Sequence, residues 1–115
     1  MRNWSNTYEY RATSVEAPTS IAEVQQLVAR SPRVRALGTR HSFNDIADTE
    51  GVLVTTTEIP ADFAIDEERR VLTVGAGTRY AAIAAFLTEQ GWALHNMGSL
   101  PHISVGGATL SLIHI

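Results

Sequence analysis

Apolar residues at the three- and four-residue spacing of an α-helix begin after about twenty residues. Ser20 and Glu23 have the spacing of a capping box, in which each side chain satisfies a backbone N–H at the start of a helix. Pro32 then interrupts the pattern. These signals predict a helix over about residues 20–30, with an apolar face formed by Ile21, Val24, Leu27 and Val28.

A second stretch with helical spacing follows the turn Gly75-Ala76-Gly77. Thr78 is a residue type that caps helices, and Gly91 suits the left-handed conformation that ends them. The pattern therefore predicts a helix from Thr78 to about Gln90. Its buried side would consist of Ile83, Phe86 and Leu87, and the alanines at 81, 82, 84 and 85 would permit close packing.

Short β-branched or apolar runs fill much of the remaining chain and predict strands. These runs are residues 34–37, 52–56, 63–65, 71–74 and 92–94. The third and fourth would form a hairpin across the charged turn 66–70. With an extended lead-in that contains Trp4, Tyr8 and Tyr10, the order of elements suggests an α+β fold with a mixed sheet.

Length and composition narrow the class of protein. A chain of 115 residues predicts one domain or part of a larger one, and a 44% hydrophobic share is typical of globular proteins. The net charge is −3 and the basic residues do not cluster, so we expect neither a nucleic-acid partner nor a membrane partner. The absence of cysteine excludes disulfides and thiolate metal sites, and it fits a cytoplasmic location. The first twenty residues lack the apolar run of a signal peptide.

The segment with the most chemical information is the polar loop that follows the predicted strand 34–37. Gly38 opens it, and small polar residues continue it through His41 to Asn44. Consecutive backbone N–H groups in such a turn can point inward and form an anion nest, with the hydroxyls of Thr39 and Ser42 as further donors. A pyrophosphate would suit this nest. The alternative is an ordinary loop with a surface histidine.

A second loop, residues 96–109, is rich in glycine and serine. Small residues allow the backbone to approach a phosphate or a flat ring closely. The alternative is a flexible loop, although Leu100, Ile103 and Val105 favour packing.

Other chemical interpretations are weaker. Gly75-Ala76-Gly77 begins like a dinucleotide-binding G-x-G-x-x-G, but Tyr80 stands at the third glycine position and no acidic residue follows about twenty residues later. The histidines at 95, 102 and 114 lack metal-ligand spacing, so we expect no metal site. No Ser-His-Asp arrangement can be argued.

The two loops together, in this order, resemble a known family. Residues 34–55, 74–78 and 98–109 are similar to the PCMH-type FAD-binding domain of the vanillyl-alcohol oxidase-like flavoproteins, most of all to the alditol oxidases, relatives of the sugar-lactone oxidases. The likeness extends over about residues 8–109. It implies two small α/β subdomains, the first over about residues 15–58 and the second, incomplete, over about residues 59–109.

The resemblance also implies a cofactor and its contacts. His41 matches the histidine that is bonded covalently to FAD, and residues 38–43 would hold the pyrophosphate region. Gly98 would lie next to the flavin ring. The residues that would contact FAD are Gly38, Thr39, Arg40, His41, Ser42, Phe43, Gly98, Ser99, Ser104 and Gly107.

The family's reaction supplies the functional expectation. The resemblance implies oxidation of a sugar alcohol by hydride transfer to FAD, with oxygen reduced to hydrogen peroxide and the redox chemistry carried by the cofactor. Its substrates would be a small polyol or sugar and oxygen. Alternatives are an aldonolactone oxidase or dehydrogenase of the same superfamily and a non-enzymatic α+β binding module.

The end of the chain departs from the family pattern. More small residues are expected after Thr109, whereas residues 110–115 read Leu-Ser-Leu-Ile-His-Ile, which resembles the translation of a sequencing adapter. We therefore expect 110–115 to be a non-native tail. The family's catalytic residues would lie in a missing substrate domain, which leaves the catalytic residues unknown and this chain inactive by itself.

Overall fold

The computed structural model describes residues 1–97 and 100–110. The chain divides into two compact units, Met1–Pro60 and Ala61–Ile115, and each is described by itself. Gly98, Ser99 and residues 111–115 lie outside the described part, and so do the predictions made for them.

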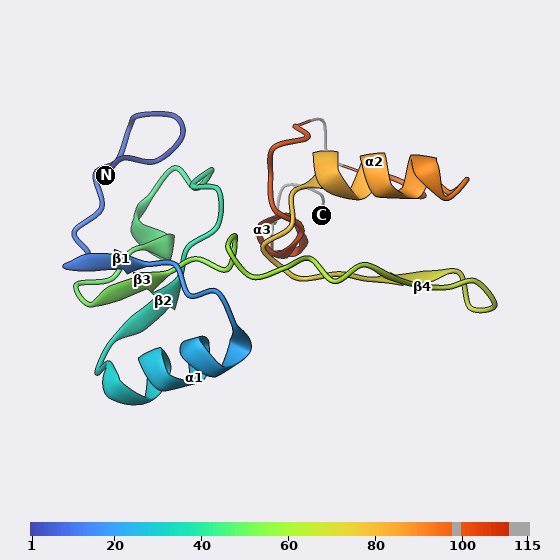
Figure 1. The fold of residues 1–115 in the computed structure, drawn as a ribbon. Coiled ribbons are helices and arrows are strands. Elements are labelled where there is room, and N and C mark those ends of the chain that lie inside the picture. The colour runs from blue at the N-terminus through green and yellow to red at the C-terminus, as the bar shows by residue number, and fades with distance from the viewer. Residues whose placement is uncertain (98–99, 111–115) are drawn as a thin grey trace. The chain divides into compact units, whose positions relative to one another are not determined.

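The first unit is built on a small parallel sheet (Figure 1). Its strands lie in the order β1-β3-β2 and are β1 (Ser14–Glu16), β2 (Val34–Ala36) and β3 (Val52–Val54). The central strand supplies the core, because Leu53 is completely buried and Val54 nearly so. The strands predicted over 34–37 and 52–56 are confirmed with shorter bounds.

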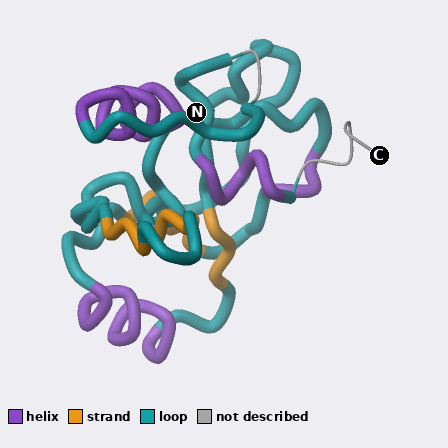
Figure 2. The backbone as a smooth tube through the Cα atoms, turned by 90° about the vertical axis from the view of Figure 1, so that its right-hand side faces the viewer, coloured by secondary structure: helices purple, strands orange, loops and turns teal. Residues whose placement is uncertain are grey.

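Helix α1 (Ile21–Arg30) connects β1 to β2 and lies along one side of the strands in both views (Figures 1 and 2). Half of the predicted capping box forms: the Ser20 hydroxyl accepts a hydrogen bond from the backbone N–H of Glu23. The Glu23 carboxylate instead accepts from the backbone and hydroxyl of Thr19. Leu27 is buried as predicted, whereas Ile21 and Val28 are exposed in the described part of the chain.

The second unit begins with the predicted hairpin. Strand β4 (Ala64–Asp66) pairs antiparallel with β5 (Val71–Thr73). The hairpin is a separate two-stranded sheet, so the expectation of one mixed sheet is wrong. Both strand pairs described in the first unit, β1 with β3 and β2 with β3, are parallel. Strands that run in the same direction need a crossover connection instead of a tight turn, and α1 supplies it between β1 and β2.

Helix α2 (Tyr80–Glu89) follows the hairpin and buries Ile83 and Leu87 as predicted. The ring of Phe86 stacks on Phe63, with centroids 4.3 Å apart. Gly91 has a φ of 77°, and the N–H groups of Gly91 and Trp92 close the helix on the carbonyls of Thr88 and Leu87. The predicted left-handed end is therefore confirmed.

Three details of the second unit differ from expectation. The cap of α2 is Arg79, whose side chain makes no capping bond, in place of Thr78. Residues 92–94 form no strand, because the chain there leaves the end of α2 and no partner strand lies alongside within the described residues. The glycine-rich loop contains a short helix, α3 (Val105–Thr109).

The predicted α+β class is confirmed, since helices and strands are both present in each unit. The sequence predicted a boundary between subdomains at about residues 58–59, and the two compact units divide after Pro60. Among the residues that the structure describes, no helix has the length and apolar character needed to cross a membrane.

Candidate functional site

The histidine loop, residues 38–44, leaves the carboxyl end of strand β2. In parallel sheets this edge is where ligands commonly bind, because loops from neighbouring strands converge there. The backbone N–H of Leu37 still bonds to Val54 of the central strand at 2.8 Å. The loop therefore starts from a fixed point and continues to Asn44, whose side chain caps the short 3-10 helix η1 (Asp45–Ala47).

The backbone of this loop contains a left-handed residue, a feature that anion-binding turns share. Arg40 has a φ of 65°, in the left-handed region that non-glycine residues seldom occupy. Alternation of right- and left-handed residues turns successive N–H groups toward one side. Within the described part of the chain, the N–H groups of Gly38, Thr39, Arg40, Ser42 and Phe43 donate no hydrogen bond to the protein. The predicted nest thus has donors that an anion can use.

The imidazole of His41 is half-buried and held on two sides. Its Nδ1 lies 3.0 Å from the hydroxyl of Thr39. The indole of Trp4 stacks on the ring, with centroids 4.8 Å apart and planes inclined by 23°. These contacts restrict both the tilt and the rotation of the ring.

The first residues of the chain bind the histidine loop along its backbone. They form a turn closed by a bridge between Arg2 and Glu9, and in Figure 1 this turn lies on the side of the sheet away from α1. We call residues 2–9 the N-terminal clamp. Besides the stacking of Trp4 on His41, hydrogen bonds join it to the loop: the N–H of Trp4 donates to the carbonyl of Arg40 at 2.6 Å, the amide of Asn3 donates to the carbonyl of Ser42 at 2.8 Å, and the guanidinium of Arg40 donates to the carbonyl of Arg2 at 2.6 Å.

Asn3 is the centre of the clamp. The residue is 4% exposed, and its side-chain oxygen accepts from the backbone N–H groups of Thr7 and Tyr8 while its amide reaches Ser42. A buried side chain that satisfies backbone groups on two segments fixes both of them. The clamp and the histidine loop therefore form one hydrogen-bonded unit.

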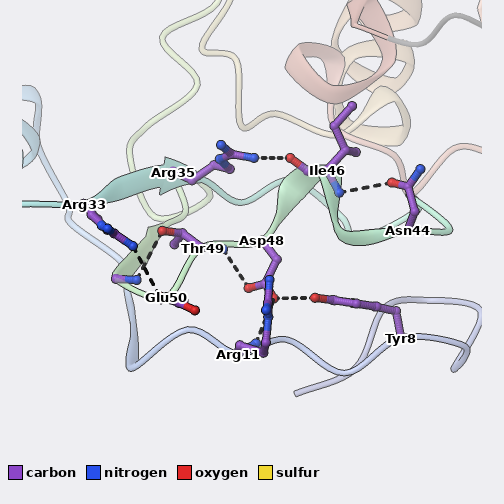
Figure 3. Close-up of polar contacts among 10 residues, drawn as sticks. Tyr8, Arg11, Arg33, Arg35, Asn44, Ile46, Asp48, Thr49 and Glu50 are labelled. Atoms are coloured by element: carbon purple, nitrogen blue, oxygen red, sulfur yellow. Dashed lines mark hydrogen bonds and ion pairs between the residues drawn. The ribbon is translucent and has the colours of Figure 1, made fainter.

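A buried carboxylate fixes the far end of the clamp (Figure 3). The side chain of Asp48 has no exposed surface; it accepts hydrogen bonds from the hydroxyl of Tyr8 at 2.7 Å and from the backbone N–H groups of Arg11 at 2.9 Å and Thr49 at 2.8 Å. Burial opposes the charged form, but these bonds outweigh it and lower the pKa of Asp48. The bond to Asp48 in turn raises the pKa of the Tyr8 phenol.

The second loop belongs to the other unit, where it is bound to the start of α2. The N–H groups of Tyr80 and Ala81 donate to the carbonyls of Ile103 and Pro101, and Gly106 donates to Ala76. A Cβ on Gly106 would lie 3.0 Å from the carbonyl oxygen of Ala76, so only glycine allows this approach without movement. Residues 100–107 of the loop are thus packed, as the apolar residues indicated.

The predicted ligand residues of this loop are placed as follows. Ser104 is 3% exposed and precedes α3, with no capping bond from its hydroxyl. Gly107 lies in α3 and is exposed in the described part. Gly98 and Ser99 lie outside the described residues. The predicted ligand residues therefore fall into two groups. Residues 38–43 form one loop of the first unit, and residues 100–107 lie against Gly75-Ala76-Gly77 in the second unit.

The structure also shows what the sequence did not reveal. Asn3, Trp4 and Asp48 hold the histidine loop in place, although the first residues were expected to be only an extended lead-in. The concentration of Trp4, Tyr8 and Tyr10 in so short a segment was the available signal. Across the described ranges, no cluster of three or more histidine, aspartate or glutamate side chains could hold a metal ion.

Comparison with known proteins gives a consistent result. A family model described as an FAD binding domain matches residues 12–114. The chain is 41% identical to alditol oxidase from a Streptomyces species, in a match that covers 97% of this chain and 28% of that protein. It is 33% identical to L-gulono-1,4-lactone dehydrogenase of Mycobacterium tuberculosis, over 97% of the chain and 27% of the relative.

The fold is similar to that of solved structures. One of them, cholesterol oxidase from B. sterolicum, superimposes with a TM-score of 0.69 at 21% sequence identity, and the superposition covers 93% of this chain and 22% of that chain. At this identity the likeness concerns the fold alone. The chain spans little more than a quarter of the length of the curated relatives described above.

Proposed function

Because the chain belongs to the FAD binding domain family, we propose that it is the FAD-binding part of an oxidase that acts on an alditol or related sugar alcohol, with FAD joined covalently to His41. The relative named alditol oxidase supports the substrate class. The proposal also includes a cytoplasmic location, for which the cysteine-free composition is the only support.

The observation that carries the proposal is the construction of the histidine loop. Among the residues that the structure describes, no protein acceptor is found for five backbone N–H groups between Gly38 and Phe43, around a left-handed Arg40. Together with the hydroxyls of Thr39 and Ser42, they provide donors for a diphosphate. The residues present therefore fit the phosphate part of FAD.

His41 is proposed as the covalent attachment residue. Its ring is fixed between Thr39 and Trp4 and is not fully buried. Attachment would form a C–N bond between an imidazole nitrogen of His41 and the flavin 8α-methyl carbon at the expense of one C–H and one N–H bond. FAD would supply the electron acceptor for this oxidation, and oxygen would take up the two electrons and two protons as hydrogen peroxide.

The second loop is proposed to contact FAD through Ser104 and Gly107, and also through Gly98 and Ser99. The Ser104 hydroxyl makes no capping bond in α3, so it can donate to a ligand oxygen. Gly107 has no Cβ to cover its exposed backbone.

When bound, FAD would supply hydride acceptance from the alcohol carbon and return of the electrons to oxygen. This chain's residues would bind and orient it. The catalytic residues that handle the substrate proton are not assigned to this chain, and we propose that it does not turn over substrate alone.

A second candidate is favoured by the relatives named for lactones. L-gulonolactone oxidase of Mus musculus is 31% identical over 98% of the chain and 27% of the relative. An aldonolactone oxidase or dehydrogenase would use the same flavin residues with a different substrate pocket.

The two candidates predict different substrates for the full-length protein. Hydrogen peroxide formed from xylitol or sorbitol, but not from L-gulonolactone, is the expected result. Peroxide from the lactone alone would establish the lactone oxidase, and reduction of a dye by lactone without peroxide would establish a dehydrogenase. A colourless protein that binds no added FAD would refute the flavin assignment itself.

A further inference from the structure

We propose that Trp4 is a positioning residue for His41, and that the N-terminal clamp orients the imidazole for flavin attachment. This inference rests on the proposed function of His41. It goes beyond the flavin-binding loops because it assigns a role to residues that precede the family match, which begins at residue 12.

The contacts of Trp4 are those of an orienting group. Its indole stacks on the His41 ring, with the ring centroids 4.8 Å apart. Its backbone N–H donates to the carbonyl of Arg40, the residue before His41, at 2.6 Å. One residue therefore fixes both the ring of His41 and the backbone from which that ring projects. Thr39 fixes the same ring through Nδ1.

The exposure of Trp4 argues against a purely structural role. The residue is 56% exposed, whereas core residues of this unit such as Leu27 and Leu53 are 5% exposed or less. Removing an exposed indole costs little stability, since most of its surface is already in contact with water. The main effect of its removal would be on the orientation of His41.

The left-handed conformation of Arg40 gives the clamp a further purpose. Such a conformation is unfavourable for a residue with a Cβ, and it persists where neighbouring contacts enforce it. Here two hydrogen bonds from the clamp hold Arg40. The carbonyl of Arg2 accepts from the Arg40 guanidinium, and the backbone N–H of Trp4 donates to the Arg40 carbonyl. The turn that presents His41 is thus held by the same segment that stacks on it.

Part of the clamp lies within the sequence matched by a relative. The match to the alditol oxidase covers 97% of this chain, which leaves too few unmatched residues for all of residues 2–9 to lie outside it.

The test measures flavin attachment in the full-length oxidase, prepared without FAD and then mixed with it. The variants are Trp4→Ala, Trp4→Phe and His41→Ala, with Val28→Ala as the control for loss of an exposed apolar side chain in the same unit. We expect Trp4→Ala to attach flavin at least about tenfold more slowly, while its noncovalent FAD affinity changes by less than about twofold. Trp4→Phe keeps a stacking ring and should restore most of the rate.

A second measurement needs no cofactor. The ring current of Trp4 should shift the carbon-bound proton signals of His41 in the apoprotein, and this shift should disappear in Trp4→Ala but not in Val28→Ala. Wild-type attachment rates in Trp4→Ala, or unchanged His41 signals, would overturn the positioning role. Flavin that remains attached in His41→Ala would overturn the proposed attachment residue, and with it this inference.

Discussion

Replacing Asp48 by asparagine tests how the N-terminal clamp is held. The substitution preserves shape but removes the charge and one acceptor. In the native protein the hydroxyl of Tyr8 and the backbone N–H of Arg11 both donate to Oδ2, and Thr49 donates to Oδ1. An asparagine amide can place its oxygen at only one of these two positions, so at least one backbone N–H loses its acceptor.

The expected loss follows from these contacts. An unsatisfied buried donor costs about 1–3 kcal/mol, and bonds to a charged acceptor are stronger than those to a neutral one. The ion pair with Arg11 adds little, because that side chain is 60% exposed. We therefore expect Asp48→Asn to lower the free energy of unfolding by about 2 kcal/mol at neutral pH.

The effect should depend on pH with a defined sign. The folded protein lowers the pKa of Asp48, so the carboxylate stabilises the fold above the pKa of an unfolded aspartate, about 3.9. This contribution is lost as the pH falls through the lower, folded pKa. The difference between wild type and Asp48→Asn should therefore shrink in acid.

Urea unfolding of the 115-residue chain, followed by circular dichroism at pH 7 and in acid, measures both quantities. Asp45→Asn is the matched control, since it removes an exposed carboxylate of the same segment. A Tyr8 titration provides a second check, because loss of the Asp48 carboxylate should lower the pKa of the phenol. If Asp48→Asn is no more destabilising than Asp45→Asn, the carboxylate does not hold the clamp.

Three further substitutions test local features by urea unfolding of the same chain. Gly106→Ala should destabilise it by about 1–3 kcal/mol, because the new Cβ would lie 3.0 Å from the Ala76 carbonyl oxygen; unchanged stability would contradict the close packing of the second loop. Gly91→Ala should cost about 1 kcal/mol, since its φ is 77°, and a stabilised variant would refute this reason. Ser20→Ala should also cost about 1 kcal/mol through loss of the cap on Glu23, whereas Ser20→Asp, which keeps an acceptor, should not.

Local signals predicted most elements correctly. The Ser20 cap, the Gly91 terminus and the charged turn 66–70 act through neighbouring residues, so the sequence alone contains their cause. The prediction of a strand at 92–94 was wrong, because a strand depends on residues that are distant in the sequence. A strand requires a partner, and propensity does not show whether one lies alongside.

The histidine loop could be predicted only in part. Gly38 and the hydroxyl residues identified a possible anion nest, but the left-handed turn falls on Arg40, which no propensity indicates. The clamp was not foreseen because Asn3 and Ser42 are 39 positions apart, and Tyr8 and Asp48 are 40 apart. Contacts of this range depend on the path of the whole unit.

The most direct test of the central claim is to map the flavin on the protein. All basic residues are arginines, so trypsin releases one peptide, residues 41–69, in which His41 is the only histidine; the remaining histidines all follow Arg79. The full-length protein should be purified, denatured in acid, digested and analysed by mass spectrometry with flavin fluorescence. The account predicts that the fluorescence and the added mass of one FAD lie on peptide 41–69 and disappear in His41→Ala. Flavin on a peptide after Arg79, or flavin released entirely by acid, would contradict it.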